Sequence, residues 1–320
     1  MKIASNEKFA CLAFHECWLA PGFPDEIQLA PNVWAAQKLD VKMGSHWARW
    51  VGSLAMDALT DASLVIYTTM PSANPEALDG ENKELARRLD YVLYGLLLQG
   101  VPRHSKGFAF NGANSEGEVG VRQFSNVRRY LPTYGLPDFR PGVAELQLAM
   151  SLAPRLRDIG NGGANWERLR GGIKVLLGGS EEEDSGERLH DFVRALEALL
   201  RPDIGSTKTQ FAHRTDQTFV LSNAETRDTL LEIYEMRSRV EHLHPVLDAL
   251  QGNTATRIAT ANRRTCQIDA LARRSLRRVV GTAPLLETFR TEANIAAFWN
   301  LPDAARVAAW SDRWDLRSIK

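Results

Sequence analysis

The chain has 320 residues, 44% of them hydrophobic, which is enough for one large domain or two ordinary ones with a sizeable core. Lysine plus arginine and aspartate plus glutamate number 39 each, which excludes a strong net field favouring nucleic acid or an anionic membrane. The sequence contains no apolar run of the roughly 18 to 20 residues that a bilayer span needs, and its amino terminus lacks the pattern of a secretory signal. We therefore expect a globular, cytoplasmic protein with no membrane partner.

The first half of the sequence reads as mixed α and β. Strands are predicted over Phe9–Leu19 and Leu64–Met70 from their length and their β-branched and aromatic content. A helix is predicted over Glu84–Gly100, and a hairpin over Gly107–Phe124 around an Asn/Gly/Ser turn. Between residues 132 and 154 there are four prolines and no clear periodicity of apolar residues, so no helix or strand is predicted there.

The three cysteines fit a reducing compartment. Cys11 and Cys17 would lie about 20 Å apart at strand rise, too far for a disulfide without a turn between them. Cys266 stands alone on a predicted helix, so neither a disulfide framework nor a CxxC metal site is expected. All three are predicted to be ordinary buried thiols.

The clearest change of composition is LLGGSEEEDSGERLHDF, residues 176–192, where glycines and a block of acids separate two helical patterns. We predict a domain boundary here. It separates a mixed α/β domain over residues 1–180, with a sensing or regulatory role by analogy only, from an all-α domain over residues 187–320. The predicted fold class is therefore α+β.

Four main helices are predicted after the boundary. Apolar residues recur at helical spacing from Leu189 to Leu200, and a second helix begins at a Ser206 cap. A third begins with Ser222 and Glu225 at capping-box spacing and should stop near His244, because Pro245 follows. The fourth is predicted over Ile268–Val280.

Six arginines lie on or just before the fourth predicted helix. Such a set is able to follow a nucleic-acid backbone, and the alternative is that pairs of arginines flank an apolar seam and keep the helix soluble. The six are Arg263, Arg264, Arg273, Arg274, Arg277 and Arg278.

The third helix ends in YEMRSRVEHLHPV, residues 234–246, which places arginines and histidines close together. Cleaving RNA without a metal requires removal of a proton from the 2′-hydroxyl, donation of one to the leaving 5′-oxygen, and stabilisation of charge on the phosphoryl oxygens. Histidine suits the proton transfers because its ordinary pKa is near neutrality, and arginine suits the phosphate because its planar fork stays charged. Arg237 with His242 or His244 is therefore a candidate catalytic pair.

Spacing alone does not decide which histidine faces Arg237. At about 100° per residue, Arg237 and His242 are about 140° apart on a regular helix, whereas Arg237 and His244 are about 20° apart. Pro245 ends the helix, however, so the residues before it need not keep helical angles. Both histidines stay candidates at this point.

The arrangement Arg237-Ser238-x-x-x-His242, preceded by Tyr234, resembles the R-x4-6-H motif of HEPN domains, and most closely their ApeA-like branch. The likeness covers roughly residues 187–301, and it includes FVRALEALL in the first predicted helix and the distal ARRSLRRVV segment. It implies that Arg237 binds phosphate and that His242 is the general acid or base. Where that branch often has glycine after the histidine, this chain has Leu243.

The resemblance implies a metal-independent endoribonuclease that leaves a 2′,3′-cyclic phosphate, acts as a homodimer, and serves prokaryotic defence against phage or growth arrest. RNA, and a regulatory partner or phage trigger, would be its partners, and no cofactor or metal is expected. The alternative is a non-catalytic HEPN module that binds RNA or a partner protein. Besides Arg237, His242 and His244 as catalytic residues, the predicted substrate-binding residues are Ser238, Arg239, Arg274 and Arg278. Motifs for zinc peptidases, serine hydrolases and P-loop enzymes are absent from the sequence.

Overall fold

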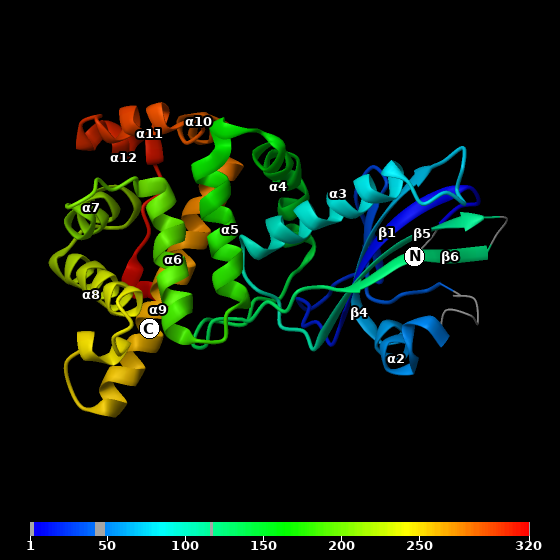
Figure 1. Cartoon of the computed structure of the whole chain (residues 1–320), viewed down its shortest axis with the longest axis horizontal. Helices are drawn as coiled ribbons and strands as arrows, with labels where there is room; N and C mark the ends of the chain where they lie inside the picture. Colours follow the sequence, from blue (N-terminus) through cyan, green and yellow to red (C-terminus); the bar gives the residue numbers. More distant parts are fainter. Residues whose placement is uncertain (1–2, 42–48, 116–117, 320) are drawn as a thin grey trace. The chain divides into compact units, whose positions relative to one another are not determined.

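The computed structural model describes residues 3–41, 49–115 and 118–319. It contains a six-stranded antiparallel sheet and a predominantly helical carboxyl-terminal region, which confirms the predicted α+β class (Figure 1). Two compact units divide the chain: residues 1–97, 101–129 and 138–157 form the first, and residues 98–100, 130–137 and 158–320 form the second. Among the described helices, none is both long and apolar enough to cross a bilayer.

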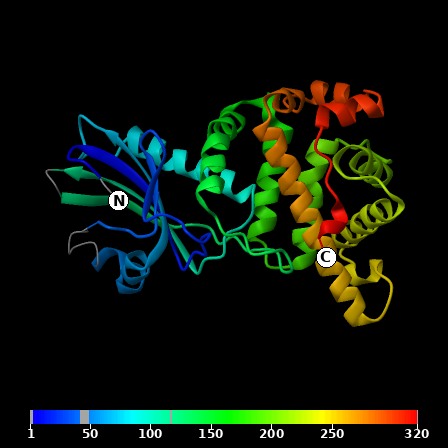
Figure 2. The ribbon, with the colours of Figure 1, turned by 180° about the vertical axis from the view of Figure 1, so that it is seen from behind.

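The sheet of the first unit, drawn on the left of Figure 2, has the strand order β2-β3-β4-β1-β5-β6. In chain order the strands are β1 (Glu7–His15), β2 (Glu26–Ala30), β3 (Val33–Ala36), β4 (Ala62–Pro71), β5 (Lys106–Ser115) and β6 (Glu118–Asn126). The predicted strands correspond to β1 and β4, and the predicted hairpin to β5 and β6, whose turn at residues 116–117 lies outside the described residues. β1 is buried on both faces from Lys8 to Phe14, as expected of a central strand covered on two sides.

Helices cover both faces of this sheet. Helix α3 (Gly80–Leu97), which confirms the helix predicted there, packs on β1, β4 and β5. The opposite face carries α2 (Ser53–Thr60), whose Ala58 and Leu59 join Phe9 and Phe110 in an apolar cluster. No helix was predicted around α4 (Val143–Asn161), which contains Pro154.

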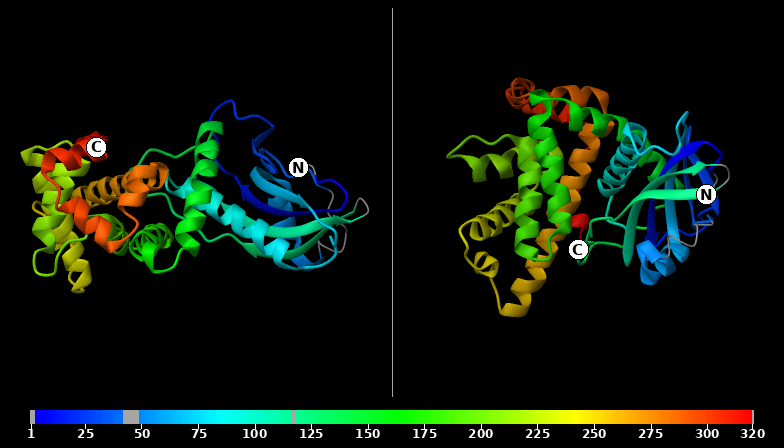
Figure 3. Two further views of the ribbon diagram at one scale, coloured as in Figure 1. Left: turned by 90° about the horizontal axis from the view of Figure 1, so that it is seen from above. Right: turned by 45° about the vertical axis from the view of Figure 1, so that its right-hand side comes forward.

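In the second unit, α6 (Ser185–Leu200) packs against α5 (Glu167–Glu181), α8 (Ala224–Glu241) and α9 (Thr254–Gly281) (Figure 3). The remaining helices are α7 (Thr207–Arg214), α10 (Ala283–Thr288), α11 (Glu292–Trp299) and α12 (Asp303–Trp310). One side of α6 is continuous core, because Leu189, Phe192, Val193, Leu196 and Leu199 are all fully buried. The helical period that predicted α6 therefore reflects its packing.

The predicted boundary at residues 180–187 falls inside the second unit, because α5 and α6 belong to it together. The acidic block forms the short connection between these two helices. Asp184 is the amino-terminal cap of α6, and its Oδ1 accepts hydrogen bonds from the backbone N–H groups of Gly186 and Glu187 at 2.8 and 3.0 Å. These acids favour the start of α6 through the helix dipole.

The third and fourth predicted helices begin elsewhere than expected. α8 is capped by Asn223, whose Oδ1 accepts from the N–H of Thr226 at 2.8 Å, whereas the hydroxyl of Ser222 donates to Asp216 at 2.7 Å. α9 begins at Thr254, well before the predicted start. Its first turns are largely solvent-exposed, so the sequence there lacks the apolar period that the prediction used.

Candidate active site

The last turn of α8 ends in a tight capping turn that positions both candidate histidines. The N–H of His244 donates to the carbonyl of Arg239 at 2.8 Å, and the N–H of Leu243 donates to that of Val240 at 3.0 Å. These are the two bonds of a Schellman motif, in which the residue after the cap has left-handed backbone angles. Leu243 takes that position with φ 59°. A leucine therefore occupies a conformation that favours glycine.

Residue 243 has the backbone conformation that a glycine would take most easily, although this chain has a leucine there. The Leu243 side chain is 91% exposed, so it contributes little packing in return. The strain is of order 1 kcal/mol and is offset by the carbonyl groups that the turn satisfies.

Arg237 lies one turn before this end of α8 and is already held by two carboxylates. Its guanidinium forms an ion pair with Glu241 on the same helix and a second, at 3.6 Å, with Glu197 on α6. It also lies over the ring of Tyr234, 5.4 Å from the centroid. Only 13% of its side chain is exposed, so these contacts are largely shielded from water.

The charge of Arg237 shifts the pKa values of two side chains on α6, Glu197 and His190. Burial raises the pKa of Glu197 above its ordinary value, and the charge of Arg237 opposes that rise. Burial lowers the pKa of His190, and the positive charges of Arg237 and Arg194 lower it further. The Nδ1 atom of His190 is shielded from water and has no hydrogen-bond partner within the described part of the chain. Burial is therefore the main cause of the lowered pKa of His190, and the charge of Arg237 adds to it.

The sequence analysis did not identify His190. It lies on α6, far from Arg237 along the chain, and only the packing of α6 against α8 brings the two together. One signal was present: His190, Arg194 and Glu197 are spaced i, i+4 and i+7, so they lie along one side of α6.

Both predicted catalytic histidines are exposed to solvent at the end of α8. The backbone N–H of His242 still donates to the carbonyl of Ser238 at 3.2 Å, so His242 continues the helical path and lies on a different side of the helix from Arg237. His244 follows the left-handed residue. Neither imidazole forms a side-chain hydrogen bond or ion pair within residues 3–41, 49–115 and 118–319.

The predicted substrate-binding residues lie on two helices, α8 and α9. Ser238 lies on α8, partly buried, and Arg239 pairs with Glu235 at 3.5 Å. Arg274 and Arg278 on α9 contact the end of α12 and the residues that follow it. Arg274 pairs with Asp312 at 2.6 Å, and Arg278 donates to the carbonyl of Trp310 at 2.7 Å.

Two other arginines of the predicted basic set also have partners within the chain. Arg264 pairs with Glu232 of α8, and Arg273 is buried against Asp269 at 2.6 Å. The hydroxyl of Thr133, from the segment 130–137, donates to the same Asp269 at 2.6 Å. These arginines therefore connect segments of the second unit, because a guanidinium donates hydrogen bonds to several carboxylate and carbonyl oxygens.

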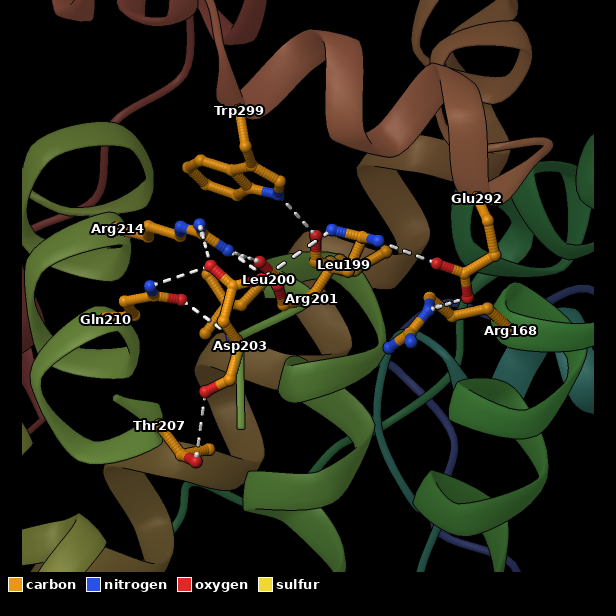
Figure 4. A network of polar contacts seen from close by, with 10 residues as sticks. All are labelled: Arg168, Leu199, Leu200, Arg201, Asp203, Thr207, Gln210, Arg214, Glu292 and Trp299. Carbon is orange, nitrogen blue, oxygen red and sulfur yellow. Dashed lines mark hydrogen bonds and ion pairs between the residues drawn. The ribbon is translucent and has the colours of Figure 1, made fainter. Parts of the chain in front are cut away.

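The carboxyl end of α6 is held by a network of polar contacts (Figure 4). Trp299 Nε1 donates to the carbonyl of Leu199 at 2.9 Å, and Arg214 donates to the carbonyls of Leu200 and Arg201 at 2.7 and 2.6 Å. These donors satisfy carbonyls that a helix end leaves without intrahelical partners. They fix the end of α6 that carries Glu197.

Glu292 of α11 bridges Arg201 and Arg168, with an oxygen 2.8 Å from Arg201 Nε (Figure 4). Beside this bridge lies a pocket of about 420 Å³ between α5 and α6, and Glu197 is part of its lining. Its charged residues are three arginines and three glutamates, so the lining has no net charge. They are Arg168, Arg194, Arg290, Glu167, Glu197 and Glu292.

The three cysteines are free and buried, as predicted. Burial raises the pKa of the Cys17 thiol to about 12 and that of the Cys266 thiol to about 11, so both are protonated at neutral pH. No group of three or more histidine, cysteine, aspartate or glutamate side chains suited to a metal ion occurs among the described residues.

Comparisons with protein-family models, curated proteins and solved structures return no match for this chain. The resemblance to HEPN domains therefore stays a prediction from the sequence pattern of residues 187–301.

Proposed function

We propose that the second unit is a metal-independent endoribonuclease of the HEPN type, in which the 2′-hydroxyl of RNA attacks the adjacent phosphorus and a 2′,3′-cyclic phosphate is left. The observation that supports this proposal best is the shielded cluster where α6 meets α8. There, the guanidinium of Arg237 pairs with Glu197 of α6, burial and the charge of Arg237 lower the pKa of His190 on the same α6, and the exposed His242 and His244 lie at the end of α8. The cluster contains the cation and the proton-transfer groups that this reaction needs.

Arg237 would bind the scissile phosphate after one of its carboxylate partners moves away. Glu241 is the partner that can leave, because 43% of its side chain is exposed whereas only 15% of Glu197 is. A phosphate oxygen would then replace the Glu241 carboxylate on the guanidinium fork. Glu197 would stay and hold the fork in place.

The proton transfers would use two imidazoles. A histidine with a lowered pKa is neutral and is able to accept the proton of the 2′-hydroxyl, which suits His190. His242, at the exposed helix end, would donate a proton to the leaving 5′-oxygen, and His244 is the other candidate for this role. We infer that two copies of the chain pair so that both α8 ends face one cleft. The proposed biological role is cytoplasmic, in prokaryotic defence against phage or in growth arrest, with the first unit as the regulatory part.

The test is cleavage of a labelled RNA by the purified full-length chain in the presence of a chelator. Arg237→Ala and His242→Ala are expected to lower the rate at least a hundredfold, since each removes one group that acts in the transition state. His190→Ala and His244→Ala show which other imidazole participates. The matched controls are Arg227→Ala on the exposed face of α8 and His213→Ala on α7, and both should cleave as the wild type does.

Equal cleavage by the wild type, Arg237→Ala and His242→Ala would reject this assignment. If the wild type does not cleave RNA but binds it in a salt-dependent manner, the non-catalytic HEPN module is the better description.

A further inference from the structure

An exposed tryptophan lies beside two arginines in the first unit. Trp18, which follows β1, is 40% exposed. The guanidinium carbons of Arg103 and Arg140 lie over its ring, 4.7 and 5.2 Å from the centroid. Backbone hydrogen bonds hold the three segments together, because the N–H of Trp18 donates to the carbonyl of Arg103 and the N–H of Ala20 donates to that of Pro141, both at 3.1 Å. The ring and the two guanidinium groups therefore form one cluster.

A basic hollow of about 350 Å³ continues from this cluster, because Arg103 is followed directly by residues that line it. Among the described residues, its lining includes His104, Lys106 and Arg129 and contains no aspartate or glutamate. Burial lowers the pKa of His104, the carbonyl of Pro102 opposes this change, and the charge of Arg129 lowers the pKa further. The positive charge of the hollow therefore comes mainly from Lys106 and Arg129.

Three carboxylates occur close to this surface, outside the lining of the hollow. Asp138 pairs with Arg103 at 3.7 Å, and Glu16 lies 3.8 Å from the Nδ1 atom of His15. Glu145 accepts a backbone hydrogen bond at 2.9 Å just before the start of α4. The ion pair of Arg103 is solvent-exposed, and such a pair contributes little, so a phosphate is able to replace Asp138.

Two of the cations are available to a bound anion. The side chains of Lys106 and Arg140 form no ion pair or hydrogen bond within residues 3–41, 49–115 and 118–319, and the contact of Arg140 with Trp18 is through the ring. Both side chains are exposed to solvent. A phosphate that binds them displaces only water.

The cluster and the hollow are close enough for one extended ligand. Arg103 and Lys106 are three positions apart, so their Cα atoms are at most about 11 Å from each other. The N–H of Val127 donates to the carbonyl of Gly107 at 2.8 Å, which places the segment before Arg129 beside the start of β5. Four exposed cations therefore follow one surface: Arg103, Lys106, Arg129 and Arg140.

We propose that this surface of the first unit binds single-stranded RNA. Exposed cations along a surface bind successive phosphates, and unpaired bases stack on an aromatic ring or on a guanidinium plane. The surface combines both features. In a duplex the bases stack on one another and do not reach Trp18, and an acidic peptide would use the cations without needing the ring. The proposal concerns binding by the first unit and does not depend on the ribonuclease activity of the second.

The experiment is a titration of the full-length chain against a fluorescein-labelled oligouridine of about 12 nucleotides, followed by fluorescence anisotropy. Every 2′-oxygen of the probe is methylated, so the probe has no nucleophile and cannot be cleaved. Trp18→Ala should weaken binding at least fivefold, because one stacked base is lost, and Trp18→Phe should keep most of the affinity. Lys106→Gln should weaken binding and lower the slope of log Kd against log salt by about 0.7, the value for one lost phosphate contact.

Lys83→Gln is the matched control, because it removes the charge of an exposed lysine on α3, outside the lining of the hollow. It should bind the probe as the wild type does, and circular dichroism verifies that each variant keeps its fold. A duplex of the same length and an oligoglutamate should both bind at least tenfold more weakly than the single strand.

Three results would overturn the proposal. The first is that the single strand does not bind the wild type, and the second is that the duplex or the oligoglutamate binds as tightly as the single strand. The third is that Trp18→Ala and Lys106→Gln keep wild-type affinity while Arg237→Ala loses it, which would place the binding on the second unit. Failure of the cleavage test leaves all three measurements unchanged, because the probe cannot be cleaved.

Discussion

At the scale of single residues, the charge of Arg237 reaches groups on two helices. It pairs with Glu197 and Glu241 and lowers the pKa of His190. A guanidinium in a partly shielded site acts strongly on its neighbours, because less water screens its field than at the surface. Arg237 is thus the centre of the cluster.

We predict that Arg237→Gln raises the pKa of His190 towards its ordinary value. Burial remains the larger cause of the low pKa, so the rise is partial. The ring protons of His190, followed by NMR as a function of pH, measure this shift directly. Arg227→Gln, which changes an exposed arginine on the same helix, should leave the titration unchanged.

His190 also makes the stability of the chain depend on pH. Because its folded pKa is lower than the unfolded value of about 6.5, the unfolded chain binds a proton that the folded chain does not. The folded chain therefore keeps its full free energy of unfolding above the unfolded pKa of His190. Part of that free energy is lost as the pH falls through the lower, folded pKa. Denaturant unfolding of the wild type and His190→Gln between pH 7.5 and 5 should show a smaller loss in the variant. Equal losses of unfolding free energy in the wild type and in His190→Gln would contradict this account.

At the scale of elements, the end of α8 combines a favourable capping turn with an unfavourable residue. Leu243→Gly should raise the free energy of unfolding by about 0.5–1 kcal/mol, because relief of about 1–2 kcal/mol of backbone strain exceeds the entropy that glycine adds to the unfolded chain. Chemical denaturation measures the change. Leu243→Ala shortens the side chain but keeps the strain, so it should give no gain. If alanine stabilises the chain as much as glycine, the strain is not the cause.

The sequence predicted β1 and β4 from the length and the β-branched and aromatic content of their segments, the β5–β6 hairpin from its turn residues, and α6 from its helical spacing of apolar residues. The strands β2 and β3, of five and four residues, are too short to show a pattern, and the beginning of α9 is largely exposed and carries no apolar period. The sequence predicted only those site residues that lie close together along the chain. Arg237 and the histidines lie on one helix, whereas His190 and the Asp312 partner of Arg274 come from distant segments.

At the scale of the whole molecule, neither compact unit is one continuous stretch of chain. The second unit takes α5 and the segment 130–137 from before the boundary that composition predicted. Leu169, Ile173 and Leu176 of α5 are buried. A division of the chain at residue 187 would therefore cut through a packed core.

We predict that a fragment of residues 187–320 does not unfold cooperatively, because it lacks α5 and the hydroxyl of Thr133 that binds the buried Asp269. A fragment of residues 130–320 retains both and should show a cooperative transition. Thermal unfolding followed by circular dichroism compares the two. Equal melting temperatures and cooperativity would show that the segments before residue 187 are dispensable.

The hydrogen bond between Thr133 and Asp269 also has a consequence for biosynthesis. Its two residues are 136 positions apart. At translation rates of about 5–20 residues per second, the ribosome needs roughly 7 to 27 s to make the intervening chain. Residues 130–137 must wait through this interval without their final neighbours, so a nascent chain that stalls before α9 would present them to chaperones or proteases.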